Sequence, residues 1–357
     1  MTGMLLMHAL ATLAFASDLS VETVSRLKVA WTYQTDATPP DEHAGRMAAF
    51  EATPVLAGGL LYVITPFNQV IALDPETGVE RWRFDPHLAK DRQYTEASAR
   101  GVAVAGGKVY FGTLDARLIA LDAGSGRLVW QTRLGANSND GNYQVTSPPV
   151  IVGTTIIVGS SIADNGRAAM DRGTVRAFDV KTGTPRWTWD PTPPGATGAA
   201  NAWAPMSVDA ERDLVLIPTG SASPDFYGGV RPGDNRYANC VVALRASTGR
   251  LLWSFQVVHH DLWDYDVASR PEPIEFGGKP AVGVLTKIGH YFVLDRLTGK
   301  PLLPVQERPV PHSDVEGERA IIARLSPFFD AERFAAQFGT QEARDHMLEG
   351  LKKAGFH

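Results

Sequence analysis

One nine-residue pattern recurs along this chain and constrains its fold more than any other feature. An apolar run ends in Asp, or in Arg in one copy, then a turn with Gly at its fifth position leads into a short strand that closes on Trp. Four copies are nearly identical, at residues 74–82, 122–130, 179–187 and 245–253. A fifth, at residues 295–303, has lost its Trp. Because Asp and Gly favour turn conformations that β-branched residues resist, each copy predicts a β-hairpin.

The spacing of the copies predicts how the hairpins assemble. Trp31 and the four later tryptophans, at positions 82, 130, 187 and 253, are separated by 51, 48, 57 and 66 residues. A further strand pair precedes the hairpins, for example at residues 53–63 and 101–112. Four short antiparallel strands in a unit of roughly fifty residues are typical of a β-propeller blade. Since one blade cannot bury both of its faces, each Trp is expected to pack against the neighbouring blade. The sequence therefore predicts an all-β propeller.

Composition removes several classes of function. Charged residues make up 20% of the chain and hydrophobic residues 44%, which is ordinary for a soluble globular protein. The net charge is -5 and no basic run is present, so nucleic acid is not an expected partner. The single cysteine, Cys240, excludes an internal disulfide framework and a Cys-rich metal site. It lies in an apolar run and is interpreted as a small core residue.

Two long connections and one unusual loop are the candidate site. The connections at residues 160–172 and 220–237 are much longer than their counterparts elsewhere. Loops extended on a rigid repeat scaffold are where functional sites usually lie. Residues 258–266 contain two histidines, three acids, one Trp and one Tyr, and propeller packing does not require such a loop.

These loops resemble those of a known family. Residues 259–264, HHDLWD, are similar to a signature of the quinoprotein dehydrogenases that use pyrroloquinoline quinone (PQQ). The other matching segments are residues 65–74, 100–102, 159–165 and 292–296, and the resemblance covers residues 20–325. It favours the glucose-dehydrogenase branch, because residues 96–99 read EASA where the alcohol-oxidising branch has adjacent cysteines.

The resemblance implies two catalytic residues. Asp261 matches the general base that takes the proton from the substrate hydroxyl, and a carboxylate beside aromatic residues suits that role. Without the resemblance, Asp261 would also fit a turn-capping residue. Lys287 matches the cation that polarises the quinone carbonyl, whereas its sequence context alone would favour a solvated lysine at a strand end.

The resemblance also implies a cofactor site. Trp203 matches the aromatic floor on which PQQ stacks, and Arg100 matches a partner for its carboxylates. Thr146 and Ser160 fall where the family offers hydroxyls to the same groups, and Lys287 contacts the cofactor as well.

The predicted metal is Ca²⁺ or Mg²⁺. Asp164 and Asn165 match its oxygen ligands, although this pair alone would more simply predict an Asx turn. The match leaves open whether Ser221 or Ser223 adds a ligand.

The expected protein is thus a PQQ-dependent dehydrogenase of a glucose-like sugar or a related alcohol, passing electrons to a separate quinone or cytochrome. A non-catalytic scaffold and an inactive remnant of the family are the alternatives. Residues 1–16 are interpreted as a signal peptide for export to the periplasm, residues 17–325 as the propeller and residues 326–357 as a helical tail. The family ring has eight blades, so about five to six are expected here. Open edges of such a ring favour self-association or a completing chain.

Overall fold

The computed structural model describes residues 20–37, 48–88, 96–134, 143–165 and 171–307, together with the single residues 39, 45, 94, 345 and 349. The predicted signal peptide lies outside the described residues, and so does the predicted helical tail apart from two single positions. The described helices include two short 3₁₀ turns, η1 (Val24–Arg26) and η2 (Ala210–Arg212). None of the helices within the described ranges has the length and apolar character that a membrane crossing needs.

Four sheets contain four antiparallel strands each, in simple chain order. They are β2 (Val55–Ala57), β3 (Leu60–Ile64), β4 (Val70–Leu73) and β5 (Glu80–Phe84); β7 (Ala103–Ala105), β8 (Lys108–Gly112), β9 (Arg117–Asp122) and β10 (Leu128–Arg133); β12 (Val150–Val152), β13 (Thr155–Val158), β15 (Val175–Asp179) and β16 (Pro185–Trp189); and β17 (Ser207–Asp209), β18 (Leu214–Pro218), β19 (Cys240–Arg245) and β20 (Leu251–Gln256). A fifth sheet has three strands, β21 (Glu272–Phe276), β22 (Lys279–Leu285) and β23 (Tyr291–Asp295).

Two small two-stranded sheets lie in the connections. The strands β1 (Ala48–Ala49) and β6 (Ala97–Ser98) pair in parallel, and β11 (Tyr143–Gln144) pairs with β14 (Ser161–Ile162) in antiparallel fashion. An isolated parallel bridge joins Thr53 to Gly101. The β1–β6 pair and the Thr53–Gly101 bridge join segments that lead into different large sheets, whereas β11 and β14 both lie next to strands of the sheet β12–β13–β15–β16.

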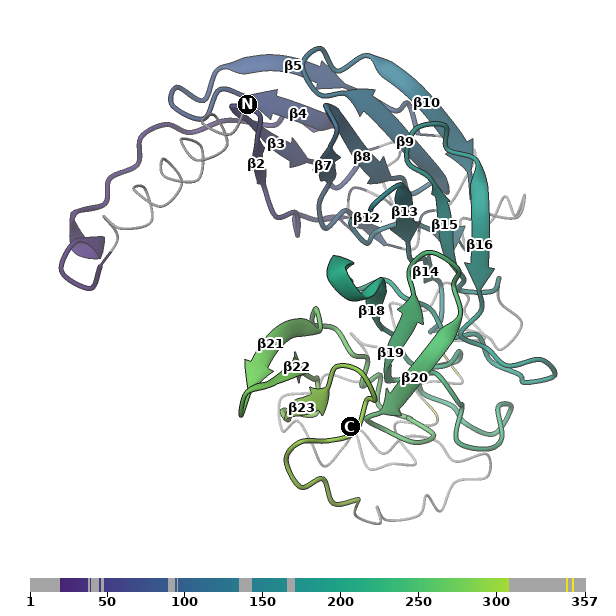
Figure 1. The fold of residues 1–357 in the computed structure, drawn as a ribbon. Helices are drawn as coiled ribbons and strands as arrows, with labels where there is room; N and C mark the ends of the chain where they lie inside the picture. Colours follow the sequence, from purple (N-terminus) through teal and green to yellow (C-terminus); the bar gives the residue numbers. More distant parts are fainter. Residues whose placement is uncertain are drawn as a thin grey trace.

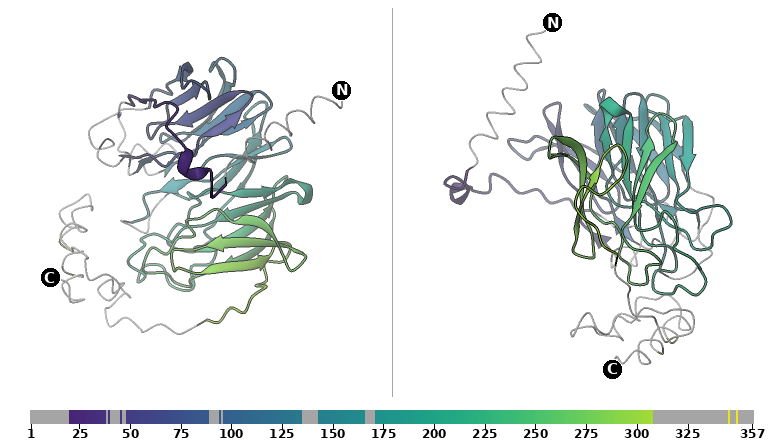
Figure 2. Two further views of the ribbon diagram at one scale, coloured as in Figure 1. Left: turned by 90° about the vertical axis from the view of Figure 1, so that its left-hand side faces the viewer. Right: turned by 60° about the horizontal axis from the view of Figure 1, so that its bottom comes forward.

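The five large sheets follow one another around an arc (Figures 1 and 2). Contacts between their first strands run in order from β2 to β7, β12, β17 and β21, which places these strands on the inside of the arc. The prediction of four-stranded antiparallel propeller blades is confirmed, and within the described residues the arc does not close into a ring.

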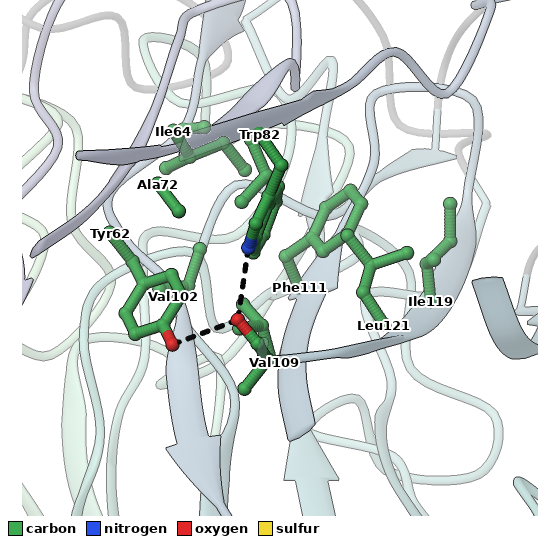
Figure 3. Packing of buried hydrophobic residues seen from close by; sticks show 12 residues of the cluster. Tyr62, Ile64, Ala72, Trp82, Val102, Val109, Phe111, Ile119 and Leu121 are labelled. Carbon is green, nitrogen blue, oxygen red and sulfur yellow. Dashed lines mark hydrogen bonds between the residues drawn. The ribbon is translucent and has the colours of Figure 1, made fainter. Parts of the chain in front are cut away.

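Each repeated Trp docks on the next blade, as the repeats predicted. The indole nitrogen of Trp82 donates to the carbonyl oxygen of Ala123 at 3.0 Å, and the Tyr62 hydroxyl donates to the same oxygen (Figure 3). The Trp82 ring covers Gly126, whose φ is +70° and on which a Cβ atom would lie 2.6 Å from the ring. Glycine is therefore required at this turn for its conformation and for the absence of a side chain. The same pairing joins Trp31 to Gly78, Trp130 to Gly183, Trp187 to Gly249 and Trp253 to Gly299.

A β-bulge sets the register of each closing strand. In the first sheet Trp82 pairs with Ala72, while Glu80 pairs with Leu73, so one extra residue lies between them. The other three four-stranded sheets repeat this arrangement, each with its Trp opposite an alanine. The small alanine leaves room for the indole ring, and the bulge turns the ring toward the next blade.

Candidate active site

The candidate residues lie in connections at one end of the blades. Arg100, Thr146 and Trp203 precede the first strands β7, β12 and β17, and Lys287 follows β22. In an antiparallel meander the start of the first strand and the end of the second lie at the same edge. The fold therefore places all of the predicted residues at that edge, which explains how segments far apart in sequence share one site.

Lys287 and Trp203 converge on a carboxylate that the sequence did not single out. The ammonium of Lys287 donates to Oδ2 of Asp266 at 2.9 Å and to Oδ2 of Asp264 at 3.1 Å. The indole nitrogen of Trp203 donates to the same Oδ2 of Asp266 at 3.2 Å. Burial lowers the pKa of Lys287, but the charges of Asp266 and Asp264 outweigh it and raise the pKa above its usual value. Lys287 is thus held as a fixed cation.

A second cation lies over the Trp203 ring. The Cζ atom of Arg100 is 4.3 Å from the ring centroid, and Nζ of Lys287 is 5.9 Å from it. Arg100 also donates to Oγ1 of Thr146 at 2.6 Å and forms an ion pair with Glu51 at 2.9 Å. An aromatic face flanked by two cations suits a flat, anionic ring system. These contacts of the described residues fit the shape and charge of PQQ.

The hydroxyl of Ser160 forms a hydrogen bond within the fold. Its side chain is fully buried, and Oγ donates to the carbonyl oxygen of Thr174 at 3.1 Å. Its own carbonyl oxygen accepts from the amide of Ala202 at 3.1 Å. Through this backbone hydrogen bond, Ser160 links the segment after β13 to the segment that carries Trp203.

Asp261 is buried and held by four donors. Its Oδ2 accepts from the hydroxyl of Ser221 at 2.5 Å, from Nδ2 of Asn239 at 2.9 Å and from the amide of Tyr265 at 2.6 Å. Its Oδ1 accepts from the amide of Trp263 at 3.0 Å. The Asp261 side chain is 1% exposed, and its hydrogen bonds to the amides of Trp263 and Tyr265 fix the conformation of the loop. These contacts hold the Asp261 carboxylate in one position.

Asp264 instead faces the open part of the site. Its side chain is 32% exposed, and its backbone is left-handed with φ of +58°. A non-glycine residue in this conformation is uncommon and is a feature of many functional loops. Burial and the charge of Asp266 raise the pKa of Asp264 to about 8 despite the nearby ammonium of Lys287. Among the three acids of the loop, Asp264 has the exposure and proton affinity that a general base needs.

The predicted metal ligands lie beside a second pair of acids. Asn165 donates to Oδ2 of Asp225 at 2.9 Å, and Asn201 donates to Oδ2 of Asp164 at 2.6 Å. Burial and the charge of Asp266 raise the pKa of Asp164 to about 7. Burial and the charge of Asp164 raise the pKa of Asp225 well above its usual value. The charge of Arg231 lowers the pKa of Asp225, but burial and the neighbouring acids outweigh it.

The donor atoms of this group suit a hard cation. Oδ1 of Asn201 and Oδ1 of Asp225 are buried and have no hydrogen-bond partner in the described structure. No three His, Cys, Asp or Glu side chains of the described residues gather into a metal centre by themselves, so amide oxygens would have to contribute. Carboxylate and amide oxygens are ligands that Ca²⁺ and Mg²⁺ accept.

A buried arginine joins the long 220–237 connection to the loop at 258–266. Arg231 is fully buried, and its guanidinium donates to the carbonyl oxygens of Pro224 and Asp225, both at 3.1 Å, and to that of Asp261. His260 adds a contact from its Nδ1 atom to the carbonyl oxygen of Gly233 at 2.6 Å. The two loops are thus fixed to each other on the side away from Lys287.

Comparison with known proteins shows the family of the chain. Residues 13–350 match the family model described as the β-propeller domain of PQQ-dependent glucose, ethanol and alcohol dehydrogenases. The chain belongs to the PQQ-dependent dehydrogenase family. Similar quinoproteins include quinoprotein glucose dehydrogenase A of Acinetobacter calcoaceticus, which is 35% identical over 88% of this chain and 45% of its own length. The quinate/shikimate dehydrogenase (quinone) of Acinetobacter baylyi is 36% identical over 85% of this chain and 43% of its own length.

Solved quinoprotein structures share the fold. The quinohemoprotein alcohol dehydrogenase ADHIIG of Pseudomonas putida HK5 has a TM-score of 0.65 and 30% identity over 75% of this chain and 43% of its own. A europium-containing methanol dehydrogenase has a TM-score of 0.68 and 26% identity over 79% of this chain and 54% of its own. The chain spans about half the length of the relatives that it matches.

Four residues that the sequence did not single out contact the predicted site residues in the structure, namely Asp225, Asn201, Asp264 and Asp266. Asp264 and Asp266 belong to the same short loop as Asp261, and three acids of one type could not be ranked from the pattern alone. Asp225 lies in the 220–237 connection, whose length was the available signal.

Proposed function

We propose that this chain binds PQQ with Ca²⁺ or Mg²⁺ and oxidises a CH–OH group of a glucose-like sugar or a related alcohol. The observation that carries the proposal is the convergence of Lys287 and Trp203 on Asp266, with Asp264 beside the same ammonium. Membership of the PQQ-dependent dehydrogenase family supports the reaction class. The names of relatives, which include glucose, quinate and glycerol dehydrogenases, support a polyhydroxylated substrate.

In this proposal each side chain of the site has its own role in the oxidation. Asp264 would accept the proton of the substrate hydroxyl. PQQ, when bound, would supply the two-electron acceptor for the hydride of the adjacent carbon. Lys287 places a fixed positive charge beside the Trp203 ring, where it favours negative charge on a quinone oxygen. Trp203, Arg100 and Thr146 would hold the cofactor, and Asp164 and Asn165 would hold the metal.

Asp261, which the sequence match predicted as the base, has a different position in this proposal. Its carboxylate is occupied by four donors within its own loop and neighbouring strands. It therefore orients the turn that presents Asp264. The two assignments make opposite predictions for single substitutions, which are given in the Discussion.

The proposal includes a periplasmic location and a separate electron acceptor, a quinone or a cytochrome. Relatives named as quinone-linked dehydrogenases support the first type of acceptor. The outer sheet β21–β23 exposes Leu285 and Tyr291 by 56% and 55%, and this apolar surface supports self-association or a completing chain.

The test is reconstitution of the purified chain with PQQ and either cation. Saturable PQQ binding, a rise in melting temperature and dye-linked oxidation of glucose, quinate, glycerol or ethanol are expected. A parallel sample without PQQ is the control. Binding without oxidation of any substrate would favour an inactive family member, and the absence of PQQ binding would favour a propeller that acts as a scaffold.

A further inference from the structure

Two acids from different long connections meet beside the site. Asp164 follows β14, and Asp225 lies in the 220–237 connection. The amide of Asp225 donates to the carbonyl oxygen of Asp164 at 3.2 Å, so the two residues are adjacent. Asp225 is 1% exposed. Two carboxylates so close together repel each other when both are ionised, and a bound cation would remove this cost.

The side-chain amides of two asparagines, and not cations, donate hydrogen bonds to these acids. Asn201 donates to Asp164 and Asn165 donates to Asp225, each through Nδ2. Oδ1 of Asn201 and Oδ1 of Asp225 remain buried without a hydrogen-bond partner in the described structure. Half a turn of the Asn201 amide would exchange its nitrogen and oxygen atoms. Two oxygen atoms would then face each other at Asp164, which is favourable only with a cation between them.

We propose that Asp225 and Asn201 are ligands of the divalent cation, Ca²⁺ or Mg²⁺, together with Asp164 and Asn165. The cation then connects the 220–237 connection directly to the connection after β14. This inference deepens the proposed function, on which it rests, by adding two ligands from residues outside the matched motif. Asn165 is exposed, whereas Asp225 is buried.

The proposed ligand set predicts that the stability of an Asp225→Asn variant depends on whether the cation is present. Replacing Asp225 with Asn retains an oxygen that accepts from Asn165 but removes a carboxylate that lies beside Asp164. Without cation the variant should therefore be as stable as the natural chain or more stable. With cation it should lose most of the stabilisation, because a charged ligand is missing. A merely structural aspartate would show the opposite result, with lower stability in both conditions.

The experiment is a titration of the EDTA-treated full chain with CaCl₂ and, separately, MgCl₂, in the absence of PQQ and substrate. Calorimetry gives the affinity, and thermal unfolding gives the stabilisation. At a hundredfold excess over Kd the melting temperature of the natural chain should rise by about 4 °C. Asp225→Asn should weaken binding at least roughly tenfold and should not lower the melting temperature in EDTA. Asp234→Asn, an exposed carboxylate of the same connection, should match the natural chain in both measurements.

Two results would overturn the inference. One is unchanged affinity of Asp225→Asn for the cation that binds the natural chain. The other is the absence of saturable binding of either cation to the natural chain. The proposed function fails separately, if the chain binds cation as described but neither binds PQQ nor oxidises any substrate. Because the titration contains no PQQ, the two failures are distinguishable.

Discussion

The ammonium of Lys287 lies 3.1 Å from Oδ2 of Asp264, yet the pKa of Asp264 is raised to about 8. A cation at this distance alone would lower the pKa of a carboxyl group. Burial and the charge of Asp266, which also contacts Lys287, are the larger effects. One lysine shared between two aspartates thus leaves one of them with the proton affinity of a general base.

Asp264→Asn should reduce turnover by about 10²–10⁴-fold, the usual contribution of a general base. PQQ binding should be retained, and thermal stability should be equal or higher because the repulsion between Asp264 and Asp266 is removed. Steady-state kinetics and thermal unfolding of the PQQ-loaded protein measure both. Asp261→Asn is the matched control. It should lower stability by about 2 kcal/mol, because its new amide hydrogens face the donors of Ser221 and Asn239. If Asp261→Asn alone abolished turnover at unchanged stability, Asp261 would be the base.

The pH profile of the reaction should rise toward alkaline pH. Asp264 accepts a proton only when ionised, so kcat/KM should increase as pH rises through about 8. The contribution of Asp264 to folding stability changes in the opposite direction and decreases as pH rises. A folded-state pKa above the unfolded value gives a stabilisation that is complete below the unfolded pKa, about 3.9, and is lost as pH rises through about 8. Rates measured from pH 5 to 9 test the first statement, and a flat profile would contradict it.

The docking of Trp82 on Gly126 can be tested with two alanine variants. Gly126 and Gly107 have nearly the same φ, +70° and +73°, but only Gly126 has a ring within 4 Å. Alanine at either position should lower the free energy of unfolding by about 1–2 kcal/mol, because the backbone there is left-handed. Gly126→Ala should lose about 1–3 kcal/mol more, because its Cβ overlaps the indole. Chemical denaturation of both variants measures this difference, and equal losses would show that the ring moves aside.

The fold was predictable because its determinants are local and repeated. The Gly of each turn and the Trp four residues later are fixed by backbone conformation and docking, so one copy explains the others. The spacing of the copies predicted the order of the sheets for the same reason.

The site was only partly predictable. Motif matching placed Lys287, Trp203 and Arg100 together, and the structure shows them around one indole ring. It could not distinguish Asp261 from Asp264, because their difference lies in which donors surround them in three dimensions. Asp225 was not predicted either, since its proximity to Asp164 depends on how two long connections fold against each other.

The ion pair between Asp209 and Arg296 should contribute more to stability than surface pairs do. Arg296, which follows β23, donates to Oδ2 of Asp209 in β17 at 2.7 Å, and both side chains are less than a tenth exposed. The pair joins two neighbouring blades. Burial alone would raise the pKa of Asp209, but the hydrogen bonds from Arg296 and Arg212 lower it overall. Asp209→Asn should cost about 3 kcal/mol, because the Arg296 charge then stays buried without its partner.

Acid pH should remove this contribution. A lowered folded-state pKa gives stability that is present above the unfolded value, about 3.9, and is lost as pH falls through the folded value. The difference in unfolding free energy between the natural chain and Asp209→Asn should therefore shrink as pH falls below about 4. Asp190→Asn is the control, because the Asp190–Arg172 pair is 35% and 42% exposed and should contribute less than about 1 kcal/mol. Denaturation curves at pH 7 and near pH 3 measure both differences, and equal effects of the two variants would show that burial adds nothing to the Asp209 pair.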